Sequence, residues 1–95
     1  MRKYETVYIL RPDIDEATAD AAIAKVEETI TNNGGAVEKT DKWGLKKLAY
    51  EVRDFSEGSY VVVNFTGENS TVDALEYVYK VSDTIIRSMI VKEEE

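Results

Sequence analysis

The sequence predicts an α+β domain in which four strands form one antiparallel sheet and two helices cover one of its faces. Three observations support this fold class. The apolar pattern alternates between strand-like and helical along the 95 residues, in the order strand, helix, strand, strand, helix, strand. Each change coincides with proline, glycine or helix-capping residues. Two strand-helix-strand crossovers of the usual right-handed sense then place both helices on the same face of the sheet.

The first strand is expected over residues 2–10, where aromatic and β-branched residues predominate. Pro12 ends this strand because it has no N–H to donate to a sheet. The carboxylates of residues 13–16 supply caps and negative charge for the start of a helix. Apolar residues then recur at spacings of three and four over residues 19–30. The Asn-Asn-Gly-Gly sequence at residues 32–35 ends the helix, with a glycine expected in the left-handed conformation.

The second strand is expected over residues 36–52. Its pattern is interrupted at Trp43 and Gly44, which indicates a bulge because glycine weakens the interior of a strand. The residues expected to point inward are Val37, Leu48, Tyr50 and Val52. A hairpin connection is expected at residues 54–58, followed by a third strand over residues 59–66. The two faces of this strand carry Val61, Val63 and Phe65, and Tyr60, Val62 and Asn64.

The second helix begins at residues 70–73, which resemble a capping box with aspartate in place of glutamate. Its apolar stripe consists of Val72, Leu75, Val78 and Tyr79. The fourth strand covers residues 85–91. In the resulting ferredoxin-like arrangement, a split β-α-β fold, the first and third strands are central and the others are edges. We expect one domain over residues 1–92 and a short acidic tail, residues 93–95, that does not pack.

The composition is that of a soluble globular domain, with 43% hydrophobic and 33% charged residues. The chain has no histidine and no cysteine, which removes the commonest general base, thiol nucleophiles and thiolate metal sites. No apolar run is long enough to span a bilayer, and the N-terminus carries charges where a signal peptide would need its apolar region. We therefore expect a cytoplasmic protein without catalytic residues, metal ligands or a cofactor. An acylphosphatase-like enzyme of this topology would need a phosphate-binding arginine beside an asparagine, and only Arg11 and Asn64 are conceivable.

Basic residues are concentrated in the predicted strands, although the net charge of the chain is -7. Residues 1–12 and 36–53 each carry a net charge of +2, and the helical segments are acidic. Lys46 and Lys47 are adjacent, so they point to opposite faces of the second strand. They either protect an edge strand against unwanted pairing or contact phosphate. The candidate phosphate-binding residues are Arg2, Lys3, Lys46, Lys47, Arg53, Arg87 and Lys92.

The sheet face opposite the helices is expected to be open and largely apolar. Its candidate residues are Val7, Ile9, Tyr60, Val62, Met89 and Val91. Among them only Tyr60 could stack on a nucleobase, because the others are aliphatic. This face therefore suits a protein partner or a self-contact better than splayed bases.

Over essentially its whole length the chain resembles the family of the sixth protein of the bacterial small ribosomal subunit. The string Gly-Leu-Lys-Lys-Leu-Ala-Tyr at residues 44–50 is specific for that family. The other matching residues are Arg2-Lys3-Tyr4-Glu5 with Leu10 and Pro12, Gly34-Gly35, Gly58 with Tyr60, and Ile86-Arg87 through Val91. The chain departs from the family pattern at Glu51, where the family usually has proline. Its negative charge is expected to weaken the positive potential of the two lysines.

The resemblance implies a structural role in translation, in a ribonucleoprotein that contains small-subunit rRNA and ribosomal protein eighteen. It implies that the chain binds the central domain of that rRNA and has no catalytic activity. The implied RNA-backbone contacts are Arg2, Lys3, Lys46, Lys47, Arg87 and Lys92, and the implied contacts with protein eighteen are Tyr60, Val62, Met89 and Val91. We expect a monomer in isolation. The alternatives are a non-ribosomal module that pairs through its sheet, as a homodimer or small-molecule sensor, and the acylphosphatase-like enzyme.

Overall fold

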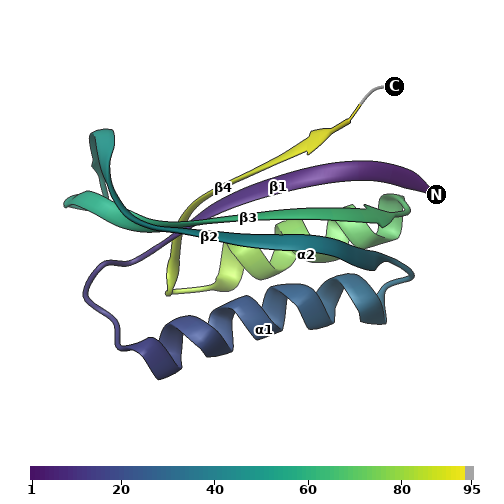
Figure 1. Ribbon diagram of the computed structural model, residues 1–95, viewed down its shortest axis with the longest axis horizontal. Helices are drawn as coiled ribbons and strands as arrows, with labels where there is room; N and C mark the ends of the chain where they lie inside the picture. Colours follow the sequence, from purple (N-terminus) through teal and green to yellow (C-terminus); the bar gives the residue numbers. More distant parts are fainter. Residues whose placement is uncertain (94–95) are drawn as a thin grey trace.

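The computed structural model describes residues 1–93 as a four-stranded antiparallel sheet with two helices on one face, which confirms the predicted fold (Figure 1). The elements are β1 (Arg2–Leu10), α1 (Glu16–Asn32), β2 (Ala36–Val52), β3 (Phe55–Gly67), α2 (Asn69–Val81) and β4 (Ile85–Lys92). The strand order is β2-β3-β1-β4. As predicted, β1 and β3 are central and β2 and β4 are edges.

The core lies between the sheet and the two helices. Alternate residues of the central strands point into it, because successive side chains of a strand face opposite sides. The predicted buried face of β3 is confirmed, since Val61, Val63 and Phe65 are all fully buried. Two aromatic contacts extend the core along β1: Tyr4 stacks on Phe65, and Tyr8 packs against Tyr79 of α2. Neither helix of residues 1–93 lies on the opposite face of the sheet (Figure 1).

Helix α1 begins and ends as the sequence predicts. The Asp15 carboxylate accepts a hydrogen bond from the Thr18 backbone N–H at 2.8 Å, which satisfies one of the free donors at the helix start. This hydrogen bond also holds the pKa of Asp15 below its usual value. At the other end, Gly34 takes the left-handed conformation with φ of +84°. Glycine is favoured there because a side chain would be strained.

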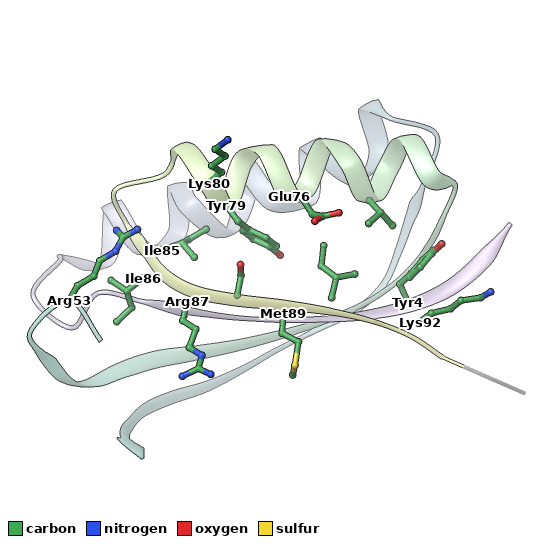
Figure 2. Close-up of a pocket in the computed structure, with 13 residues that line it drawn as sticks. Tyr4, Arg53, Glu76, Tyr79, Lys80, Ile85, Ile86, Arg87, Met89 and Lys92 are labelled. Atoms are coloured by element: carbon green, nitrogen blue, oxygen red, sulfur yellow. The ribbon is translucent and has the colours of Figure 1, made fainter. Parts of the chain in front are cut away.

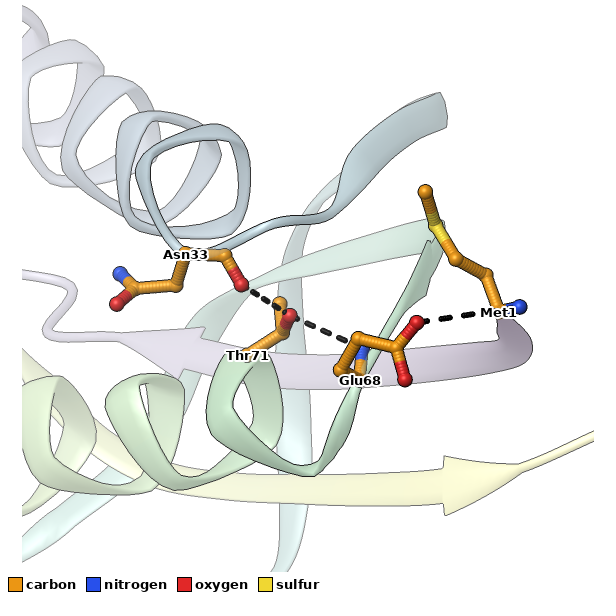
Figure 3. A network of polar contacts seen from close by, with 4 residues as sticks. All are labelled: Met1, Asn33, Glu68 and Thr71. Carbon is orange, nitrogen blue, oxygen red and sulfur yellow. Dashed lines mark hydrogen bonds and ion pairs between the residues drawn. The ribbon is translucent and has the colours of Figure 1, made fainter.

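Helix α2 begins at Asn69, and its capping residue Glu68 lies two residues before the start of the predicted capping box at residues 70–73 (Figure 3). The cap is formed by Glu68 and Thr71, because the Thr71 hydroxyl accepts from the Glu68 N–H at 3.1 Å. The same hydroxyl donates to the Asn33 carbonyl at 2.6 Å and so links the start of α2 to the end of α1. The amino group of Met1 lies 3.9 Å from the Glu68 carboxylate. The predicted capping box at residues 70–73 is therefore wrong, because the observed box lies two residues earlier, at residues 68–71. Thr71 occupies its last position, where glutamate or glutamine is usual.

The hairpin between β2 and β3 turns earlier and more tightly than predicted. Arg53 and Asp54 have φ of +51° and +67°, and they form the turn instead of residues 54–58. Beyond the predicted bulge, the paired strands bend away from the helices (Figure 1). We call residues 43–58 the hairpin arm. Because of this bend Tyr50 is 61% exposed, so its predicted inward position is wrong.

The predicted tail begins at Glu93, which follows β4 and adds one backbone hydrogen bond to β1. Its N–H donates to the Lys3 carbonyl at 2.9 Å, and its carboxylate accepts from the Asn64 amide at 2.9 Å. The remaining two residues of the predicted tail, 94–95, lie outside the described residues. The two ends of the described chain therefore meet at one end of the sheet (Figure 1).

Candidate nucleic-acid interface

The seven candidate phosphate-binding residues form two groups at opposite ends of the sheet. The first group, which we call the terminal group, consists of Arg2, Lys3 and Lys92. The second, the hairpin group, consists of Lys46, Lys47, Arg53 and Arg87. Arg2 pairs with Gly67 of β3, whereas Lys46 pairs with Gly58. These positions are nine residues apart, or about 30 Å along a strand. The structure does not bring the seven residues into one patch.

The candidate cations also divide between the two faces of the sheet. Lys46 and Lys47 pair with Gly58 and Glu57, which are neighbours on β3, so the two lysines face opposite sides as predicted. Lys3 and Arg87 share the open face with Lys46, because their partners across the sheet, Thr66 for Lys3 and Ile9 for Arg87, belong to it. Arg2 and Lys92 belong to the helix-bearing face.

None of the seven cations has a carboxylate within 4.0 Å among residues 1–93. The four ion pairs of this part of the chain involve the N-terminus, Arg11, Lys39 and Lys42 instead. Lys39 and Lys42 lie on β2, as Lys46 and Lys47 do. The ammonium nitrogen of each is 3.4 Å from a carboxylate oxygen, of Asp41 and Asp20 respectively. The structure thus distinguishes cations that are already paired from those that remain available for phosphate.

Acidic residues are less confined to the helices than the sequence pattern suggests. The four strands hold eight lysines and arginines against five acids, whereas the two helices hold two against six. The strand acids are Glu5, Glu38, Asp41, Glu51 and Glu57. The sheet therefore has a positive net charge and the helices a negative one, although each contains both basic and acidic residues.

Arg87 is held across the open face by the hairpin arm. Its guanidinium donates to the Tyr50 hydroxyl at 2.5 Å and lies 5.1 Å from the centre of the Tyr50 ring. A similar contact occurs within the arm, where the Lys46 ammonium lies 5.6 Å from the centre of the Trp43 ring. The sequence analysis assigns neither aromatic ring a contact with a cation. For Trp43 the available signal is a tryptophan beside a glycine within a strand.

A groove of about 410 Å³ lies on the open face beneath the hairpin arm. The residues that line it are Val7, Ile9, Leu48, Ala49, Tyr50, Tyr60, Arg87, Ser88 and Met89. Two of the four candidate partner contacts, Tyr60 and Met89, are thus in this groove. Val91 is exposed further along β4. Val62 is only 5% exposed, so it offers a partner protein little contact area.

A second cavity, of about 540 Å³, lies between α2 and β4 on the other side of the sheet (Figure 2). Tyr79, Glu76 and Ile85 line it. Figure 2 shows Arg87 and Met89 on the side of β4 away from α2. Arg87 and Met89 belong to the lining of both the cavity and the groove, so edge strand β4 separates the two hollows.

The residues required by the acylphosphatase-like alternative do not converge. The Arg11 guanidinium donates to both carboxylate oxygens of Asp13, at 3.0 and 2.9 Å, and lies over the Phe55 ring. This contact holds the pKa of Asp13 below its usual value. Asn64 instead pairs with Glu5, six residues before Arg11, or about 20 Å away along a strand.

Residues 1–93 contain no cluster of three carboxylate, histidine or cysteine side chains suited to a metal ion. None of the helices among them is long and apolar enough to span a membrane.

Comparisons with known proteins place this geometry in a family context. The ribosomal protein S6 family matches residues 3–92. Small ribosomal subunit protein bS6 of Desulfitobacterium hafniense is 44% identical over 95 residues, which is all of both chains. The bS6 protein of Clostridium botulinum strain Loch Maree is 47% identical over 94 residues, or 99% of this chain and 100% of the relative. The crystal structure of 30S ribosomal protein S6 from Thermotoga maritima has a TM-score of 0.92 at 30% identity, and the match covers 97% of this chain and 87% of that one.

Proposed function

The chain belongs to the ribosomal protein S6 family, and from this premise we propose that it binds the central domain of small-subunit rRNA together with ribosomal protein eighteen. Its proposed role is structural and non-catalytic, in the translation machinery of the cytoplasm. The observation that carries the RNA-binding part is the set of seven strand and strand-end cations without a carboxylate partner among residues 1–93. Such cations can neutralise phosphates without first breaking an ion pair.

The proposed RNA contacts are made to the phosphate backbone. Phosphate contacts fix the orientation of a protein on RNA but carry no sequence information. The terminal group and the hairpin group lie about 30 Å apart along the sheet, so they touch separate stretches of backbone. The shape of the folded RNA and the partner protein then supply specificity.

The open face is the proposed docking surface for protein eighteen. It offers the groove under the hairpin arm together with exposed Met89 and Val91. Apolar and aromatic residues surrounded by charged ones are typical of protein interfaces. Tyr60 contributes a ring with a polar tip to this surface, and the cations Lys3, Lys46 and Arg87 stand at its margin.

The proposal is tested by binding the chain to a central-domain rRNA fragment in the presence of ribosomal protein eighteen, over a range of salt concentrations. We expect Lys46→Ala with Lys47→Ala to weaken assembly and to flatten the dependence of log affinity on log salt, by about one unit per lost phosphate contact. The matched control is Lys25→Ala with Lys80→Ala, which removes the same charge from the helices.

An equal loss in both double variants would mean that total charge matters and not the position of the lysines. An unchanged salt slope in the Lys46 and Lys47 variant would reject these two contacts. Sedimentation of the isolated chain tests the remaining part of the proposal, because we expect a monomer. A stable dimer without affinity for RNA and protein eighteen would favour the sheet-pairing alternative.

A further inference from the structure

Trp43 occupies the extra position of a β-bulge. In the pairing of β2 with β3, Lys42 lies opposite Val61 and Gly44 lies opposite Tyr60. Trp43 therefore has no partner across the ladder. Gly44 has φ of +82°, a conformation that residues with a side chain rarely adopt. Bulges redirect side chains and are frequent beside functional sites.

The bulge leaves the indole ring in water. Trp43 is 55% exposed, although tryptophan side chains are highly buried on average. The Lys46 ammonium lies 5.6 Å from the centre of its ring. That lysine has no carboxylate within 4.0 Å among residues 1–93. A large aromatic surface and an available cation thus stand side by side at the root of the hairpin arm.

We propose that Trp43 stacks on an unpaired base of the rRNA while Lys46 contacts the phosphate of the same nucleotide. The inference rests on the RNA-binding function proposed above. Sequence-tolerant recognition of single-stranded RNA combines an aromatic platform for a base with a cation for the backbone. The Trp43 and Lys46 pair supplies both parts. The pair thus adds a stacking contact with a base to the phosphate contacts proposed for the RNA-binding surface.

The surroundings of Trp43 favour RNA over a protein partner. Its neighbours on β2 include Lys46 and Lys47, which have no carboxylate within 4.0 Å among residues 1–93, so cations available for phosphate lie beside the ring. The apolar groove of the open face is lined by other residues of the arm, among them Leu48 and Tyr50. A protein contact would instead be expected at the centre of an apolar patch.

Intrinsic fluorescence tests the inference directly, because Trp43 is the single tryptophan of the chain. The full chain is titrated first with ribosomal protein eighteen and then with a central-domain rRNA fragment. We expect the emission to change little with the protein and to be quenched by the RNA, since a stacked base contacts the ring. A fully paired RNA duplex of the same length should not quench it.

Affinity measurements supply the second readout. Trp43→Ala should weaken RNA binding by about 5- to 150-fold, the effect expected of one stacked base. Its salt slope should stay unchanged, because no phosphate contact is lost. Lys46→Ala should lower that slope by about one unit. Trp43→Phe should recover most of the affinity, and Tyr77→Ala, which removes a 66% exposed aromatic from α2, serves as the matched control.

The outcomes separate this inference from the function on which it rests. If the RNA binds normally but neither emission nor the affinity of Trp43→Ala changes, the stacking contact is wrong and the RNA-binding function stands. Emission that changes fully with ribosomal protein eighteen alone would assign the ring to a protein contact. Absence of any RNA binding with the partner present would overturn both proposals.

Discussion

Two buried tyrosine hydroxyls differ sharply in their hydrogen bonding. The Thr6 hydroxyl donates to the Met89 carbonyl at 2.9 Å and lies 2.8 Å from the Tyr79 hydroxyl. Since the Thr6 proton is used on the carbonyl, Tyr79 must donate to Thr6. The Tyr8 hydroxyl is buried and forms no hydrogen bond within the described residues. One hydroxyl is thus part of a buried network that joins β1, α2 and β4, and the other is not.

Removing each hydroxyl should have opposite effects on stability. Tyr79→Phe leaves Thr6 with one partner fewer, so we expect the free energy of unfolding to fall by about 1 kcal/mol. Tyr8→Phe removes a buried polar atom without a partner, and we expect stability to stay the same or to rise by up to about 1 kcal/mol. Denaturant unfolding followed by circular dichroism measures both. A larger loss in Tyr8→Phe than in Tyr79→Phe would contradict this description of the core.

At the level of elements, periodicity is sufficient to predict all six helices and strands and their order. The pattern succeeds because each element repeats its apolar spacing over several residues. The β2–β3 turn is different. Its left-handed residues, Arg53 and Asp54, include no glycine, so the turn signal pointed to Gly58. That glycine is needed inside β3, where a Cβ would clash with the Ile9 side chain.

The candidate site was predictable in residue type but not in arrangement. Strand cations can be read from the sequence, yet their division into two groups follows from the register of β1 and β2 on β3. The sequence predicts the bulge at Trp43 but not the role of its ring, because a bulge breaks the alternation on which face assignments depend. Tyr50 was misplaced because the hairpin arm bends out of the plane of the sheet, and no local pattern records that bend.

Edge strand β4 allows a test of the docking face through Met89, which lines its groove. Met89→Asp places a charge in this groove, and we expect it to weaken binding of ribosomal protein eighteen. The control is Val81→Asp, which replaces an apolar side chain of similar exposure, 57%, on α2 with the same acid. Calorimetric titration with protein eighteen compares the two. Equal losses would show that the added charge, and not its place on the open face, controls the interaction.

At the scale of the whole molecule, the buried tyrosines link stability to pH. Burial raises the pKa of both Tyr8 and Tyr79, whereas an unfolded tyrosine titrates near pH 10. Above that pH the unfolded chain releases protons that the folded chain keeps, so the free energy of unfolding must decrease as pH rises. Below it, both states are protonated and this contribution is fully present.

We therefore expect stability to decline above about pH 10, by up to about 1.4 kcal/mol per pH unit for each buried tyrosine. Denaturant midpoints at several pH values between 8 and 11, at about constant ionic strength, give the slope. Tyr8→Phe should reduce it by about half, since one of the two groups is lost. Stability that does not change across this range would show that the two hydroxyls ionise in the folded chain.

Because Trp43 is the single tryptophan and lies on the hairpin arm, tryptophan fluorescence and tyrosine dichroism follow different parts of this protein. Trp43 is already about half exposed to water in the native state and does not belong to the cluster of buried residues between sheet and helices. Its emission therefore senses events on the arm and is a poor gauge of global denaturation. Near-ultraviolet dichroism of the enclosed tyrosines follows the loss of the interior, so a disagreement between these two probes would reveal local opening of the arm ahead of cooperative melting.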